Sequence, residues 1–181
     1  MNIKQLPCLS IGLTLVCAGL FYGSPNNESL LFSAELSARG EWWRAVTGHF
    51  VHVDTEHLMW NCLGLLILGT MLEHRCRKTF CAAMVAGVAA VNILLLSAYA
   101  DLYYYCGLSG VLNALLLVAL WLEWRQRHSV LIVCIGIACI AKALIETLLG
   151  VSLFTSIGWE PYAMSHLAGL AGGLCLILLA N

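Results

Sequence analysis

A serine and a histidine that could form a nucleophile–base pair stand at the starts of two apolar segments. Ser109 lies in the turn Gly107-Leu108-Ser109-Gly110, directly before an apolar run, and His166 opens another apolar run far along the chain. A serine hydroxyl is a weak nucleophile by itself and needs a neighbouring base, and histidine can accept a proton near neutral pH. The pair therefore predicts acyl-group hydrolysis, with Ser109 as nucleophile and His166 as general base.

A third apolar segment opens with two polar side chains that could stabilise the negative charge of a tetrahedral intermediate. His57 and Asn61 are four residues apart, so they share one face of a helix. Both side chains can donate hydrogen bonds, and the backbone N–H of Ser109 supplies a third donor. These three groups are the predicted oxyanion site. The competing interpretation is that His57 and Asn61 join neighbouring helices, as polar residues often do in membranes.

Ser109 and His166 have structural alternatives as well. Serine is a preferred helix N-cap residue, and a core histidine can hydrogen-bond a backbone carbonyl group. The two residues together, on one side of the protein, favour catalysis over either alternative. No acidic residue stands where it could complete a triad, so the sequence predicts a Ser–His dyad.

Metal and cofactor chemistry find little support in the sequence. His49, His52 and His57 lack the His-Glu-x-x-His spacing of zinc proteases. None of the nine cysteines pairs with another at zinc-site spacing, and their apolar surroundings predict inert thiols. Cys106 is the cysteine to follow, because it lies beside the Gly107 turn. We therefore expect no metal and no cofactor.

The composition places this chemistry in a membrane. Of the 181 residues, 61% are hydrophobic and only 10% are charged, whereas soluble domains carry about 25%. A net charge of -1 gives no reason to expect nucleic acid as a partner. Segments near the length that spans a bilayer lie at 6–23, 57–72, 79–100, 109–124, 130–149 and 165–180. We predict one all-α domain over residues 1–181, a bundle of six transmembrane helices.

The distribution of lysine and arginine predicts the orientation of this bundle. If the N-terminus is cytoplasmic, only Arg39 and Arg44 lie in outside segments. The inside segments then hold six cations: Lys4, Arg75, Arg77, Lys78, Arg125 and Arg127. Both termini are cytoplasmic in this orientation, and His57, Ser109 and His166 all lie near the outer face.

Helix length and small residues predict where Ser109 and His166 meet. Residues 110–124 rise only about 22 Å, and tryptophans anchor their inner end, so Ser109 should lie below the outer surface. Gly169 and Gly173 lie three and seven residues after His166, on the same helix face. Because small residues let membrane helices approach closely, we expect this face to press against the helix that follows Ser109.

Several other polar residues have simpler interpretations. Residues 42–44, Trp-Trp-Arg, predict an outer loop that lies among the lipid headgroups. Glu73 and Arg77 are four residues apart at the inner end of the second span and predict a structural ion pair. Lys142 and Glu146 share a face of the fifth span. Charges inside a membrane are candidates for function, although these two can also simply pair with each other.

Together these residues resemble the rhomboid family of intramembrane serine proteases. The shared pattern covers all six predicted spans in order: Trp43-Arg44, His52, His57-x-x-x-Asn61, Gly107-Leu108-Ser109-Gly110 and Ser165-His166-x-x-Gly169-x-x-x-Gly173. The resemblance implies a six-helix bundle in the bacterial inner membrane, with a water-filled cavity open to the periplasm. It implies Ser109 as nucleophile, His166 as base, and His57, Asn61 and the Ser109 amide as the oxyanion site. It also implies lateral entry of substrate helices near the second and fifth spans.

The compact chain looks most like the rhombosortase subfamily. That resemblance implies membrane-anchored substrates whose C-terminal tail has a Gly-Gly motif, an apolar helix and a basic end. Many rhomboids have an aromatic residue beneath the histidine, where this chain has Asn113, whose amide we expect to hydrogen-bond near His166.

Two alternatives to a protease remain. One is a catalytically silent rhomboid-like protein that binds membrane helices, and the intact Ser109 and His166 argue against it. The other is a small transporter, which would need polar groups through the full depth of the membrane. The candidate site residues cluster at one side instead.

Overall fold

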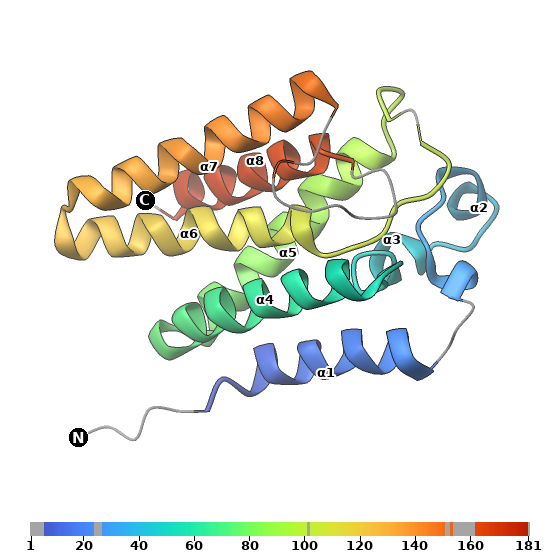
Figure 1. Cartoon of the computed structure of the whole chain (residues 1–181), viewed down its shortest axis with the longest axis horizontal. Coiled ribbons are helices and arrows are strands. Elements are labelled where there is room, and N and C mark those ends of the chain that lie inside the picture. Colours follow the sequence, from blue (N-terminus) through green and yellow to red (C-terminus); the bar gives the residue numbers. More distant parts are fainter. Residues whose placement is uncertain (1–5, 24–26, 101, 151–152, 154–161, 181) are drawn as a thin grey trace.

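Six longer helices make up the bulk of the chain (Figure 1). The computed structural model describes residues 6–23, 27–100, 102–150, 153 and 162–180. The longer helices are α1 (Cys8–Gly23), α4 (Thr55–Arg75), α5 (Arg77–Leu95), α6 (Ser109–Arg127), α7 (Val130–Leu149) and α8 (Met164–Leu179). Three short helices, η1 (Asn27–Leu30), α2 (Ala34–Ala38) and α3 (Arg44–Thr47), lie between α1 and α4. The described part of the chain is all-α, as predicted, apart from a single bridge between Phe32 and Tyr105.

Each predicted span overlaps one of the longer helices. Within the described ranges, α5 and α7 are long and apolar enough to cross a membrane, and α1 and α8 are shorter apolar helices. The predicted end of the third span at residue 100 was wrong, because α5 ends at Leu95. Ser97 Oγ donates to the Leu94 carbonyl oxygen at 2.6 Å and accepts from the Tyr99 N–H at 3.3 Å. Such local bonds of serine compete with the helix, so the chain turns there.

The helix directions bring the candidate residues to one end of the bundle. Figure 1 shows the N-terminal ends of α4, α6 and α8 and the C-terminal end of α7 at the same end. His57 and Asn61 lie in the first turns of α4, Ser109 begins α6, and His166 lies in the first turn of α8. The cations Arg75, Arg77, Lys78, Arg125 and Arg127 lie toward the opposite end, at the close of α4 and α6 and the start of α5. Lys4 lies outside the described residues.

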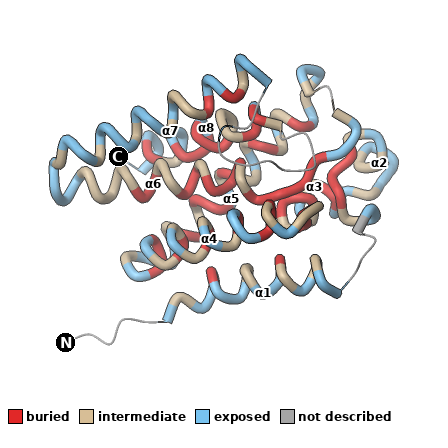
Figure 2. Tube along the Cα trace, in the orientation of Figure 1, coloured by how far each residue is buried: buried red, intermediate tan, exposed pale blue. Residues whose placement is uncertain are grey.

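Helices α4, α5, α6 and α8 enclose the apolar core. Its buried residues include Leu65 of α4, Ala83 of α5, Val111 and Leu115 of α6 and Ile177 of α8. Figure 2 shows the contrast with α1 and α7, which are mostly exposed or half-buried. Only Ser10 and Cys17 of α1 and only Ala143 and Glu146 of α7 are buried. The two peripheral helices therefore touch the bundle through few residues.

Glu73 fixes the start of α1 against the far end of α4. Its carboxylate accepts hydrogen bonds from the Leu9 N–H at 3.1 Å and the Ser10 N–H at 2.7 Å, and also from the Ser10 hydroxyl. The predicted ion pair is present but long, with Arg77 Nε 3.8 Å from Glu73 Oε2. The first N–H groups of a helix have no acceptor within the helix, and here the Glu73 carboxylate oxygens accept their hydrogen bonds. Glu73 thus has a structural role in joining two helices.

Candidate active site

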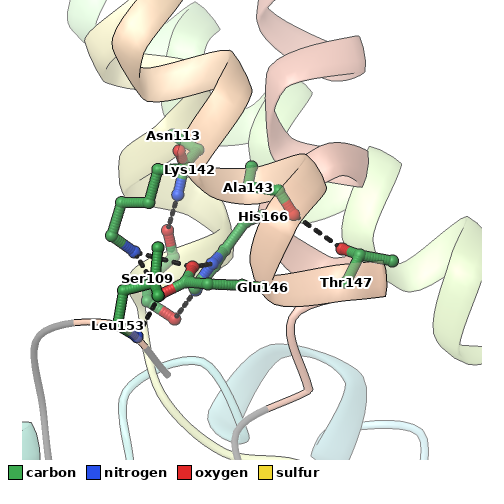
Figure 3. A network of polar contacts seen from close by, with 8 residues as sticks. All are labelled: Ser109, Asn113, Lys142, Ala143, Glu146, Thr147, Leu153 and His166. Carbon is green, nitrogen blue, oxygen red and sulfur yellow. Dashed lines mark hydrogen bonds and ion pairs between the residues drawn. The ribbon is translucent and has the colours of Figure 1, made fainter. Parts of the chain in front are cut away.

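Ser109 begins helix α6 and points its hydroxyl at His166 (Figure 3). The distance between Ser109 Oγ and His166 Nε2 is 3.0 Å. The N-cap position belongs to Leu108, and no side chain caps this helix end. The N-cap interpretation of Ser109 therefore does not apply. Its hydroxyl instead lies within hydrogen-bonding reach of a base, at a helix end where backbone N–H groups favour negative charge.

Close packing of α8 against α6 places His166 opposite Ser109. A Cβ atom on Gly169 would lie 1.8 Å from the Gly110 carbonyl oxygen, and one on Gly173 would lie 2.8 Å from the Ala114 carbonyl oxygen. Only glycine permits two backbones to come this close. The predicted contact between this face of α8 and the helix after Ser109 is confirmed.

The prediction that no acidic residue could complete a triad was wrong. Glu146, in the last turn of α7, places its Oε2 atom 3.2 Å from His166 Nδ1. The Glu146 side chain is only 2% exposed. Ser109, His166 and Glu146 thus form a continuous chain of contacts drawn from α6, α8 and α7 (Figure 3).

Two further groups fix the Glu146 carboxylate. Lys142 Nζ lies 2.6 Å from both carboxylate oxygens, one helical turn before Glu146. The backbone N–H of Leu153 donates to Glu146 Oε1 at 3.0 Å. The predicted pairing of Lys142 with Glu146 is therefore present, and it belongs to a network that reaches Ser109.

His57 and Asn61 lie directly against the Gly107 turn. Asp54 caps α4 by accepting the His57 N–H at 2.7 Å, which sets the start of that helix. Gly107 has φ +103°, and a Cβ atom there would lie 2.3 Å from His57 Nε2 and 3.4 Å from Asn61 Nδ2. Glycine is required at this position both for the backbone angle and for the room that the imidazole needs.

Asn61 carries an unused donor at this point. Its Nδ2 atom is buried and has no hydrogen-bond partner among the described residues. His57 Nδ1 has none either. A buried donor without a partner costs free energy and commonly marks a functional group. Both side chains lie against Gly107, which is two residues before Ser109 in the chain.

The loop between α1 and α4 holds the Gly107 turn in place. The Gly107 N–H donates to the Gly48 carbonyl oxygen at 3.0 Å, and the Tyr105 hydroxyl donates to the Gly107 carbonyl oxygen at 3.1 Å. Phe32 and Tyr105 exchange two backbone hydrogen bonds, 2.9 and 3.1 Å long. Neither Phe32 nor Tyr105 was singled out from the sequence, because no spacing pattern relates residues so far apart.

The histidines of this loop are buried and uncharged. His49 Nε2 contacts Asn92 Oδ1 at 3.1 Å, and burial lowers the pKa of His49 to about 4. The His52 ring meets the His57 ring edge to face, with centroids 4.9 Å apart. Burial, and next the charge of His57, lower the pKa of His52 to about 3. The uncharged His52 ring therefore packs against the His57 ring as an apolar side chain would.

Arg44 holds the same loop together from within. Its Nη1 atom donates to the carbonyl oxygens of Glu28 at 2.7 Å and Leu31 at 2.8 Å, and its Nε donates to Glu41 at 2.7 Å. The neighbouring Trp42 is 72% exposed. Arg44 is thus a structural residue of the loop rather than a member of the site.

Two remaining expectations concern Asn113 and Cys106. The Asn113 amide donates to the Ser109 carbonyl oxygen at 2.9 Å instead of bonding near His166. Both ring nitrogens of His166 are already engaged, by Ser109 and Glu146. Cys106 is buried, and this burial raises its pKa to about 12, so the thiol stays protonated and is a poor nucleophile.

Comparisons with known proteins show the family of this chain. A Rhomboid domain matches residues 39–180. Putative rhomboid protease YdcA of Bacillus subtilis (strain 168) is 26% identical over 191 residues, which cover 98% of this chain and 90% of that protein. Rhomboid protease GluP of the same strain is 36% identical over 54% of this chain and 21% of its own length. Rhomboid protease AarA of Providencia stuartii is 30% identical over 55% of this chain and 40% of its own length. The chain therefore belongs to the rhomboid family, integral membrane proteins that act as intramembrane serine proteases.

Proposed function

We propose that this protein cleaves transmembrane segments of membrane-anchored proteins, with Ser109 as nucleophile and His166 as general base. The observation that carries the proposal is the 3.0 Å contact between Ser109 Oγ and His166 Nε2 at the start of α6. That distance lies within the range over which a base can take a proton from a nucleophile.

The reaction would proceed through an acyl-enzyme. Ser109 Oγ attacks the scissile carbonyl carbon while its proton moves to His166 Nε2. The intermediate collapses, the C–N bond breaks, and His166 gives the proton to the leaving amine. Water, with His166 again as base, then hydrolyses the ester that joins the substrate to Ser109.

The oxyanion of the intermediate would lie beside Gly107. The Ser109 N–H, the Asn61 amide and the His57 imidazole are the proposed donors. The buried and unpartnered Nδ2 atom of Asn61 supports this role, because a bound oxyanion would satisfy it. Each such donor contributes about 2.7–4 kcal/mol of transition-state stabilisation where one has been removed from a soluble protease.

The proposed membrane arrangement has six spans, with both termini in the cytoplasm and the site facing the periplasm. Helices α4 and α6, of 21 and 19 residues, rise about 32 and 28 Å, which suits the ~30 Å hydrocarbon core. Helix α6 is thus longer than the ~22 Å expected from residues 110–124, so a short helix no longer argues that Ser109 lies below the outer surface. The gathering of Arg75, Arg77, Lys78, Arg125 and Arg127 at the end opposite Ser109 supports this orientation by the positive-inside tendency.

The proposed substrates are membrane-anchored proteins with a C-terminal Gly-Gly motif, an apolar helix and a basic tail. The resemblance to rhombosortases supports this class. A peptide with two glycines is extended easily, so it could reach a serine held at a helix end. Membrane lipid is the other expected partner, along the exposed apolar faces of α1 and α7.

The experiment is cleavage of such a tail by the purified full chain in detergent. We expect Ser109→Ala and His166→Ala to lose activity by several orders of magnitude with unchanged melting temperature. A matched substrate without the Gly-Gly motif tests the substrate class separately. Substantial proteolysis by Ser109→Ala would overturn the assignment. Failure of a fluorophosphonate probe to label the wild type would favour a silent membrane-helix binder.

A further inference from the structure

We propose that Glu146 is a positioning residue that orients His166. We also propose that Lys142 helps determine which atom of the side chain at position 146 faces the His166 ring. The contacts make a triad, Ser109–His166–Glu146, with a lysine behind the acid (Figure 3). The proposal rests on the proposed roles of Ser109 and His166.

The network fixes the tautomer of His166. Glu146 Oε1 accepts from Lys142 and Leu153, and Oε2 accepts from Lys142 and faces His166 Nδ1. An ionised carboxylate only accepts hydrogen bonds, so Nδ1 must carry a proton. A neutral imidazole then has its lone pair on Nε2, which faces the Ser109 hydroxyl. This is the tautomer that can take the serine proton.

Glu146 differs from the structural carboxylate of Glu73, because Glu73 accepts the first N–H groups of α1 whereas Glu146 faces a ring nitrogen of His166. The Glu146 side chain is 2% exposed on a helix whose only other buried residue is Ala143. Two packed apolar side chains would join the helices without the cost of desolvating a carboxylate. The contact with the His166 ring explains why a carboxylate stands at position 146.

Because of Lys142, replacing the Glu146 carboxylate by an amide should change the tautomer of His166. In Glu146→Gln, Lys142 and Leu153 still offer donors, so the amide oxygen is held toward them. The amide nitrogen then faces His166 Nδ1 and donates to it. That reverses the tautomer, and a protonated Nε2 faces Ser109. The base is blocked although the shape of the side chain is nearly unchanged.

The test measures how fast a fluorophosphonate probe labels Ser109 in the purified full chain. In labelling, the Ser109 oxygen bonds to phosphorus, the hydroxyl proton moves to His166 Nε2, and fluoride leaves. We expect Glu146→Gln to label on the order of 10³-fold or more slowly, the scale seen when the tautomer is reversed in a soluble serine protease. Glu146→Asp keeps the carboxylate and should label faster than Glu146→Gln even if it melts at a lower temperature.

A double variant separates orientation from packing. In Lys142→Met with Glu146→Gln, only the Leu153 N–H still holds the amide oxygen away from the ring. The amide can then turn its oxygen toward Nδ1 more often, so labelling should recover in part, by up to about tenfold over Glu146→Gln alone. A structural role predicts the opposite, since two lost partners pack worse than one. Thr147→Val is the matched control, because among the described residues the Thr147 hydroxyl bonds only the Ala143 carbonyl oxygen of its own helix, at 2.8 Å.

The outcomes distinguish this proposal from the proposed function. Wild-type labelling that is lost in Ser109→Ala, together with wild-type rates in Glu146→Gln, overturns the triad and leaves the protease assignment standing. A double variant slower than Glu146→Gln overturns it as well. Absence of labelling in the wild type overturns both. Slow Glu146→Gln with recovery in the double variant supports the role of Glu146.

Discussion

Replacing Gly169 by alanine should separate His166 from Ser109. The added Cβ atom would lie 1.8 Å from the Gly110 carbonyl oxygen, where ordinary contacts begin at 3.4 Å. The obstacle is backbone, which cannot rotate aside as a flexible side chain can. Helix α8 must therefore move away from α6 by about 1.6 Å at this level, the difference between those two distances.

The magnitude of the effect follows from the geometry of the pair. His166 is one turn before Gly169 on the same face, so its ring moves with the helix. The 3.0 Å contact with Ser109 would open beyond the 2.6–3.2 Å at which general bases act. Misplacement of a reacting group by about 1 Å can cost roughly 10²-fold in rate. We expect kcat to fall at least by that factor.

The assay compares kcat and melting temperature of purified Gly169→Ala with those of Gly136→Ala. A Cβ atom on Gly136, in α7, would meet only Leu120 Cδ1, at 3.9 Å. This control makes the same glycine-to-alanine change in a helix without a collision, so it should keep full activity. Wild-type turnover in Gly169→Ala, with the protein folded, would refute the argument that helix approach positions the pair.

Three further predictions concern single residues. Asn61→Ala should lower kcat by about 10²-fold or more with little change in KM, and full kcat with a lower melting temperature would instead indicate helix packing. Asn113→Ala should keep turnover close to that of the wild type, because its amide bonds the Ser109 carbonyl oxygen; a drop of about tenfold would contradict this. His49, whose pKa is lowered by burial from 6.5 to about 4, should make the folded state less stable in acid. Above pH 6.5 neither state binds this proton, and between 6.5 and 4 only the unfolded chain does, so stability should fall by about 1.4 kcal/mol per pH unit. Unfolding of His49→Gln at pH 7 and pH 5 should show a shallower fall than the wild type.

The parts of the fold that follow from local pattern could be predicted from the sequence. Long apolar runs predicted the six longer helices, and successive crossings of a membrane alternate in direction, which brings His57, Ser109 and His166 to one end. The register of Gly169 and Gly173 with His166 identified the contact between α6 and α8, because small residues at that spacing are needed for close approach. The end of α5 was missed because Ser97 interrupts a run that is still apolar.

The missed parts depend on how helices are rotated about their axes. The sequence placed Lys142 and Glu146 on one face of α7, but periodicity does not say which neighbour that face meets. The Asn113 amide could reach either His166 or the carbonyl oxygen four residues earlier, and the local bond was closer at hand. The pairing of Phe32 with Tyr105 is set by the whole fold, since no local signal joins them.

The unequal burial of Lys142 and Glu146 has an evolutionary consequence. The lysine side chain is 37% exposed and can extend its ammonium group toward water when it stands alone, whereas the glutamate is 2% exposed and depends on its partners. Among related sequences, a glutamate at this position without a lysine one turn earlier should be rare. A lysine without the glutamate should be tolerated. The lysine is therefore expected to have arisen first, and the acid to have been acquired only in lineages that already had it.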